Sequence, residues 1–400
     1  MTIEGGRKQF ALLYADDLAG RAGGPVASRL PTSRGRSARF VWYGNEEQLT
    51  LVVGEQERRH VDTALAIGLG ERGDRLLRLV LPHGWHEPTL HRWPWLRDDL
   101  PLEVWSHRPG VAIQHHRPMR DETQDLVRCH EDPQLHLGDR TRWVEKLMCW
   151  AGGRPDLDAA HRRDVRAWQC RGQRVLRIRR SGSGLDVVAG IDWDENSPHP
   201  TPAPVTLTGP LTAEQEAQLQ ALVREGCEQR LGGIARKADE HWLQAVLRRH
   251  PRVLGLEQPV LRELAAWRPS GSLGTKQSRP RGRGFVDLAG LDATGTLLIV
   301  ETKLGGDHML VLQGLDYRIW AEANRHRLTQ RLDCRPDAPI EIAFCVGGTG
   351  GDRPKWSPYT PAQLGTLASD LRWHVQEITS WTGDSAKSSR SPKCVWPPIT

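Results

Sequence analysis

Two apolar stretches separated by a short turn constrain the fold of this chain more than any other feature. Residues 285–291 and 296–302 are rich in Val, Leu and Ile, and residues 292–295 between them are Asp-Ala-Thr-Gly. This pattern predicts a β-hairpin, because Asp and Gly favour a tight turn. The first stretch carries Asp287, and the second runs into Glu301-Thr302-Lys303. An apolar strand that ends in Glu-x-Lys indicates a functional site better than it indicates packing.

The predicted hairpin brings three charged side chains together. Side chains alternate along a strand, so Glu301 and Lys303 share one face. Glu301 follows Asp287 by fourteen positions with the turn near the middle, which places Asp287 beside Glu301. Phosphodiester hydrolysis at neutral pH uses a divalent cation that polarises the phosphate and activates a bound water. Carboxylates suit Mg²⁺ as ligands, and a neighbouring cation stabilises developing negative charge, so these residues are suited to that chemistry.

This pattern resembles the motif of the PD-(D/E)XK nuclease superfamily, in which an Asp is followed by Glu-x-Lys on the next strand. The resemblance implies that Asp287, Glu301 and the carbonyl of Thr302 bind Mg²⁺ or Mn²⁺, and that Lys303 positions or activates the water. The usual Pro before the Asp is Val286 here. An exposed Glu301–Lys303 ion pair without chemistry is the alternative. The chain has only eight lysines and four tyrosines, yet both residue types occur at motif positions.

Two predicted helices beside the hairpin carry further candidate residues. Gln313 and Tyr317 share a face of a helix expected over residues 307–325, because they are four positions apart. They resemble the Q-x-x-x-Y motif of the RecB-like branch, which borders the active site and contacts substrate. Ordinary packing on the helix face is the alternative.

Glu240 lies on the inward face of a helix expected over residues 238–249, where a carboxylate needs a partner. The run that starts at Glu240 is similar to the helix that opens the nuclease domains of the Shedu antiphage proteins and of the archaeal mismatch endonuclease. The resemblance, which covers residues 240–346, implies that Glu240 contributes to the metal site. A charge that interacts with the helix dipole is the alternative.

A basic segment precedes the Asp287 strand. It contains no acid, and the basic side chains are Lys276, Arg279, Arg281 and Arg283. Such a loop at the mouth of a nuclease site could grip phosphates, and the alternative is a solvated loop that binds nothing. The net charge of +6 permits a nucleic-acid partner without requiring one.

The expected fold class is α/β, with a C-terminal PD-(D/E)XK restriction-endonuclease-like domain, a mixed sheet flanked by helices, and an N-terminal mixed α/β region. Residues 1–195 alternate strands and helices and would sense, recognise or assemble. Residues 196–210 carry five prolines and are expected to be a linker. The nuclease domain is expected over 211–380, opening with a capping box at Thr212 and Gln215. A disordered tail is expected over 381–400.

The resemblance implies a Mg²⁺-dependent DNA endonuclease acting in prokaryotic antiphage defence. The alternatives are a DNA-repair nuclease and a catalytically silent nucleic-acid-binding module of the same fold. We expect a homo-oligomer, with a ligand or protein partner for the N-terminal region. No run of eighteen apolar residues predicts a membrane span. The N-terminus does not resemble a signal peptide, and the seven cysteines form no C-x-x-C pair, which favours the cytoplasm.

Overall fold

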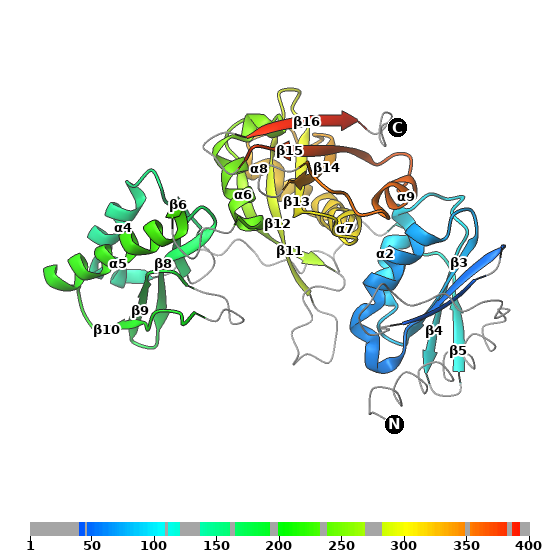
Figure 1. The fold of residues 1–400 in the computed structure, drawn as a ribbon, viewed down its shortest axis with the longest axis horizontal. Coiled ribbons are helices and arrows are strands. Elements are labelled where there is room, and N and C mark those ends of the chain that lie inside the picture. The colour runs from blue at the N-terminus through cyan, green and yellow to red at the C-terminus, as the bar shows by residue number, and fades with distance from the viewer. Residues whose placement is uncertain are drawn as a thin grey trace.

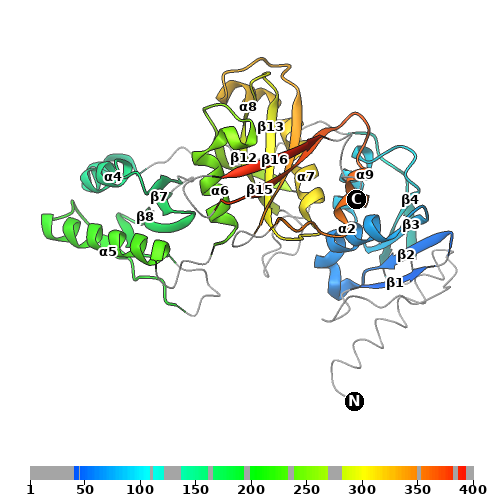
Figure 2. The same cartoon turned by 45° about the horizontal axis from the view of Figure 1, so that its top comes forward.

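The computed structural model describes residues 40–44, 46–108, 111–120, 137–160, 165–192, 199–232, 238–268, 282–348, 353–381 and 386–392. These residues form three units, each built on its own sheet. We call them the N-terminal unit (40–120), the middle unit (137–232) and the C-terminal unit (238–392). They lie in a row with the C-terminal unit at the centre (Figure 1), and the turned view keeps that order (Figure 2).

The N-terminal unit is a five-stranded mixed sheet with helices on one face. Its strands follow the order β1-β2-β3-β4-β5, and β2, β3 and β4 are parallel. Apolar residues of β2 alternate with polar ones, whereas β3 is apolar except for Arg78, and leucines of both strands lie in one core with α2. The elements are β1 (Val41–Gly44), β2 (Gln48–Val52), α2 (Val61–Glu71), β3 (Leu76–Pro82), α3 (Glu87–Arg92), β4 (Leu102–Arg108) and β5 (Val111–His115).

The middle unit is an antiparallel sheet with two helices. Its strands follow the order β10-β9-β8-β7-β6, and one core joins the sheet to Leu147 of α4 and to Leu219, Val223 and Cys227 of α5. Thr212 and Gln215 exchange hydrogen bonds before α5, which confirms the predicted capping box. The elements are α4 (Glu145–Gly152), β6 (Asp158–Ala159), β7 (Val165–Cys170), β8 (Gln173–Ser181), β9 (Gly184–Ala189), β10 (Val205–Leu207) and α5 (Ala213–Gly232).

The C-terminal unit is a six-stranded mixed sheet in the order β11-β12-β13-β14-β15-β16. Strands β13, β14 and β15 are parallel, and the other neighbouring pairs are antiparallel. The elements are α6 (Glu240–Arg249), β11 (Leu261–Arg268), β12 (Gly282–Leu291), β13 (Leu297–Leu304), α7 (Leu310–Ala323), α8 (Arg325–Arg331), β14 (Ile340–Gly347), α9 (Thr360–Gly365), β15 (Arg372–Thr379) and β16 (Lys387–Pro392).

Helices cover both faces of this sheet, which explains why β13 is apolar on both sides. Leu297 and Ile299 lie in a core with Tyr317 of α7. Leu298 and Val300 lie in a second core with Leu243 of α6. The strand is therefore held between α7 and α6, and its last residues emerge at a fixed place.

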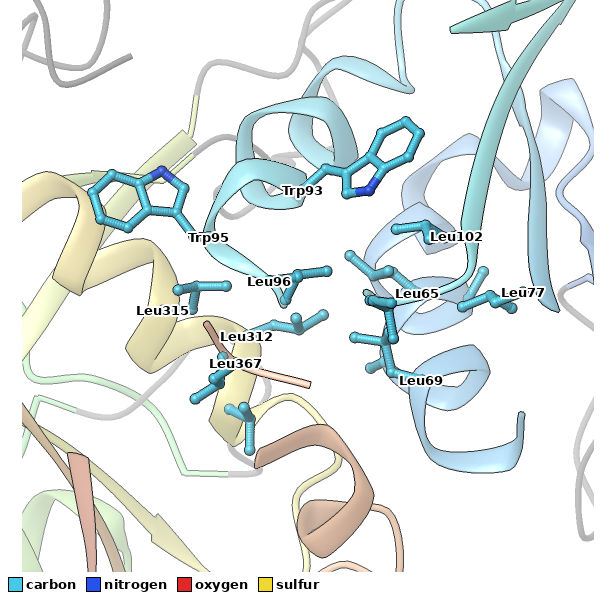
Figure 3. Close-up of a cluster of buried hydrophobic side chains, with 14 of the residues drawn as sticks. Leu65, Leu69, Leu77, Trp93, Trp95, Leu96, Leu102, Leu312, Leu315 and Leu367 are labelled. Atoms are coloured by element: carbon cyan, nitrogen blue, oxygen red, sulfur yellow. The ribbon is translucent and has the colours of Figure 1, made fainter. Parts of the chain in front are cut away.

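The N-terminal and C-terminal units share one hydrophobic core. Figure 3 shows Leu65 and Leu69 of α2 facing Leu312 of α7, with Leu96 next to Leu312. Backbone hydrogen bonds join the units where Leu96 bridges Leu367. These two units are thus packed together as one body.

Most of the predicted elements are confirmed. Strands β2, β3, β4 and β14, the β8–β9 hairpin and the β12–β13 hairpin lie within a few residues of their expected bounds. Two predicted irregular stretches contain strands: β10 lies within the expected linker, 196–210, and β16 lies within the expected tail, 381–400. Both strands are hydrogen-bonded to a sheet edge, which the side-chain pattern does not reveal. Strands β5 and β11 were not predicted.

Helix α5 belongs to a different unit from the one expected. The sequence suggested that residues 211–231 open the nuclease domain, whereas α5 packs on the sheet of the middle unit. The fold is mixed α/β, as expected. In the described part of the chain, no helix combines the length and apolar character needed to cross a membrane.

Candidate active site

Asp287 lies where β12 parts from β13. The pairing of the two strands runs from Leu291–Leu297 to Leu288–Val300, and Asp287 is the next residue along β12. Its Oδ2 accepts hydrogen bonds from the backbone N–H and from the hydroxyl of Thr302, both at 2.7 Å. The carboxylate therefore points toward Thr302 at the end of β13.

Lys303 joins two glutamates from separate elements. Its Nζ lies 3.0 Å from Oε1 of Glu301 on the same strand and 3.0 Å from Oε1 of Glu240 on α6. Glu301 and Lys303 are both buried, so this is no solvated surface pair. Asp287 is the third carboxylate of the group, because its charge and that of Lys303 act on each other. The structure thus brings Glu240, Asp287, Glu301 and Lys303 together.

The site carries an excess of acid. Burial raises the pKa of Asp287 to about 6; Lys303 opposes this shift and Glu240 adds to it. Burial lowers the pKa of Lys303, but Glu301, Asp287 and Glu240 outweigh burial and raise it above its ordinary value. Lys303 is therefore an ammonium at neutral pH. Three carboxylates around one ammonium leave a net negative charge that a cation would balance.

Two helices set the orientation of the site. Asp239 caps α6 by accepting a hydrogen bond from the N–H of Trp242 at 2.8 Å, which fixes the start of the helix at Glu240. Four residues further on, the amide of Gln244 donates a hydrogen bond of 3.2 Å to the hydroxyl of Thr302. Thr302 in turn holds Asp287, so α6 contacts both ends of the acidic cluster.

Gln244 was not among the predicted site residues. It is buried, and it acts on Asp287 only through Thr302. Its spacing of four residues from Glu240 places both on one face of α6, and this was the signal available in the sequence. The hydroxyl of Thr302 was also missed, because only the carbonyl of Thr302 had been considered.

Tyr317 lies close behind β12, and its polar atom is already used. Its ring is buried in the core under the sheet, and its hydroxyl accepts a hydrogen bond of 3.1 Å from the N–H of Phe285. Phe285 lies two residues before Asp287 on β12. Gln313 lies one turn earlier on α7, and its Oε1 is buried with no hydrogen-bond partner among the described residues. The hydroxyl of Tyr317 is therefore bonded to the backbone of β12, whereas the side-chain oxygen of Gln313 can still accept a hydrogen bond.

The predicted basic segment is described only in part. Lys276, Arg279 and Arg281 lie outside the described residues. The backbone of Arg283 belongs to β12, where it pairs with Trp267 of β11.

No family model, curated protein or solved structure matches this chain.

The chemistry of the donor set decides which ion the site would suit. Among the described residues, no three His, Cys, Asp or Glu side chains are arranged to hold a metal ion by themselves. Here the ammonium of Lys303 contacts two of the acids, and Asp287 faces Thr302. Mg²⁺ does not require three protein carboxylates, since it keeps several waters and binds one or two carboxylates together with phosphate oxygens. Asp287 and Glu301 fit that requirement.

Proposed function

We propose that the C-terminal unit is a metal-dependent nuclease of the PD-(D/E)XK kind, which hydrolyses phosphodiester bonds in DNA. The observation that carries the proposal is the contact of Lys303 with both Glu301 and Glu240, beside the partly buried Asp287. Buried acids in excess over bases are costly unless a ligand balances them. A divalent cation and a phosphate would do so.

Each residue has a separate part in this proposal. Asp287, Glu301 and the carbonyl of Thr302 would hold Mg²⁺ or Mn²⁺, and the ion would polarise the phosphate and acidify a bound water. Gln244 and the hydroxyl of Thr302 keep the Asp287 carboxylate turned toward β13. Glu240 holds Lys303 in place and adds negative charge.

Lys303 acts as a cation in this scheme. In the metal-free protein Glu301, Asp287 and Glu240 raise its pKa, so Lys303 carries a positive charge at neutral pH. An ammonium donates hydrogen bonds and stabilises negative charge as it develops on the attacking water or on the phosphate. Of the two predicted roles of Lys303, the proposal uses positioning of the water together with electrostatic stabilisation.

The test compares two acids of the same hairpin. Asp287→Asn and Lys303→Ala should each lower the cleavage of plasmid and single-stranded DNA in Mg²⁺ or Mn²⁺ by about a hundredfold or more, as loss of a charge-stabilising group does. Asp292→Asn is the matched control, because Asp292 holds only the turn between the strands. Equal activity in wild type and Asp287→Asn would refute the proposal.

A catalytically silent nucleic-acid-binding module is the competing function. It predicts binding of DNA by the wild type with no cleavage in any divalent metal, and the same experiment includes that outcome. The described site favours a nuclease, because Lys303 and Glu301 are buried and contact each other rather than lying on an open surface.

The biological setting is part of the same proposal. Antiphage defence or DNA repair in a prokaryote rests on the similarity of the segment that begins at Glu240 to Shedu proteins and to the mismatch endonuclease. A homo-oligomer and a partner of the N-terminal region remain predictions. Light scattering of the purified chain, with and without DNA, tests the first of these.

A further inference from the structure

The middle unit touches the C-terminal unit at the first turn of α6. Arg171 and Gly172 form the turn between β7 and β8, with φ of 44° and 80°. A Cβ on Gly172 would lie 2.2 Å from both the carbonyl carbon and the carbonyl oxygen of His241. Only glycine permits the two backbones to approach so closely. His241 directly follows Glu240, so the turn lies against the residue next to the site.

Arg230 of α5 stabilises the same contact between the β7–β8 turn and α6. Its Nη2 lies 3.0 Å from each carboxylate oxygen of Asp239, the residue that caps α6, and 2.9 Å from the carbonyl oxygen of Arg171. The guanidinium groups of Arg230 and Arg171 each lie 4.8 Å from the ring centroid of Trp242. Arg230 is almost fully buried. The cap of α6 is therefore completed by a side chain of another unit.

The far end of α6 has a second attachment to the middle unit. Asp158 of β6 forms ion pairs with Arg248 and Arg249 in the last turn of the helix. Arg249 is about a third exposed, unlike Arg230. The helix is thus held at both ends, and Glu240, which contacts Lys303, lies in its first turn.

We infer that the middle unit positions Glu240, and that Gly172 and Arg230 are the positioning residues through which it does so. The inference deepens the proposed nuclease function and rests on it. Glu240 contacts Lys303 at 3.0 Å, so a displacement of the first turn of α6 moves the carboxylate away from that ammonium. Misplacement of a site group by about 1 Å can lower a rate about a hundredfold. A ligand that shifts the middle unit would therefore move Glu240 and change the rate of cleavage.

The experiment compares two glycines of the same sheet. Gly172→Ala adds a methyl group that collides with the backbone of His241, whereas Gly182→Ala adds one in the β8–β9 turn, where nothing lies within 4 Å. Both positions have positive φ, so both variants carry the same kind of backbone strain. Gly172→Ala should lower kcat by about tenfold or more, with little change in KM for DNA. It should also weaken Mn²⁺ binding and speed amide hydrogen exchange in the first turn of α6. Gly182→Ala should change none of these.

A second pair of variants applies if Gly172→Ala does not fold. Arg230→Gln should reproduce the loss of kcat and the faster exchange, and Arg230→Lys should restore part of both, because a lysine keeps the charge beside Asp239. Indistinguishable exchange and Mn²⁺ affinity in Gly172→Ala and Gly182→Ala, or in Arg230→Gln and wild type, would overturn the inference. If the wild type fails to cleave DNA, the proposed function fails, while the exchange measurements still decide whether the middle unit positions α6.

Discussion

Asp287 illustrates how a single partly buried acid can serve a site and destabilise the fold. Burial raises its pKa from 3.8 to about 6, so the folded state favours the protonated form. Between these two values the folded chain binds more protons than the unfolded chain. The contribution to stability is therefore complete below pH 4 and is lost as the pH rises through about 6. At neutral pH the ionised carboxylate makes the metal-free protein less stable than a neutral side chain would.

Replacement of Asp287 should show this cost directly. We expect Asp287→Asn to raise the free energy of unfolding of the metal-free protein at pH 7 by on the order of 1–3 kcal/mol, since one pKa unit corresponds to about 1.4 kcal/mol. The gain should vanish below pH 4. Urea unfolding followed by tryptophan fluorescence at several pH values measures both effects.

The pKa of Asp292, in the same hairpin, is shifted in the opposite direction. Burial alone would raise its pKa, but hydrogen bonds from Thr294 and Thr296 outweigh burial and lower it. Asp292→Asn should therefore destabilise the protein at neutral pH. If both variants shift the midpoint in one direction, the electrostatic account of Asp287 is incorrect.

At the scale of elements, the bond between α7 and β12 connects the helix to the site. The hydroxyl of Tyr317 accepts the N–H of Phe285, two residues before Asp287. Tyr317→Phe removes the hydroxyl of this part-buried hydrogen bond, which should cost about 1–2 kcal/mol of stability. The strand before Asp287 loses its tether to α7.

Kinetics separate this role from contact with substrate. A positioning role for Tyr317 predicts a lower kcat with an unchanged KM for DNA in Tyr317→Phe, whereas a direct substrate contact predicts a higher KM. Steady-state cleavage over a range of DNA concentrations measures both constants. A change confined to KM would show that the predicted substrate contact was right and that the bond to Phe285 is incidental.

The helices and strands show which features of the fold can be predicted from neighbouring residues alone. The hairpin of β12 and β13 was predictable, because Asp292 and Gly295 mark a turn between two apolar runs. Strand β16 was not, because residues 387–392 are polar and become a strand by pairing with β15. Helix α5 was predictable as a helix, but its cap does not say which sheet its apolar face will meet. Pairing and docking depend on partners distant in sequence.

The candidate site follows the same rule. Glu301 and Lys303 were predictable from strand alternation, and Gln244 was within reach from its spacing to Glu240. The contact of Gly172 with His241 was not, because it joins a turn and a helix of separate units and leaves no pattern in either. Sequence patterns report on one element at a time, and contacts between units are absent from them.

At the scale of the whole molecule, the N-terminal unit is bound to the C-terminal unit by a buried charge. Arg92 of α3 is fully buried, and it contacts Asp316 of α7 at 2.7 and 2.8 Å and Asp62 of α2 at 2.6 Å. Asp316 directly precedes Tyr317. The two outer units thus contact the two helices that border the site. The middle unit contacts α6, and the N-terminal unit contacts α7.

This buried ion pair predicts that the two units unfold together. Arg92→Met removes the guanidinium that both carboxylates contact, which should lower the free energy of unfolding by about 3–5 kcal/mol. Arg97→Met is the matched control, because Arg97 pairs with Asp99 at an exposed place where an ion pair contributes little to stability. Urea unfolding of the wild type should show one transition. The urea concentration at its midpoint should be well above that of Arg92→Met and close to that of Arg97→Met. Equal midpoints for the two variants would mean that Arg92 does not stabilise the junction. Two separate transitions in the wild type would mean that the shared core does not unite the units.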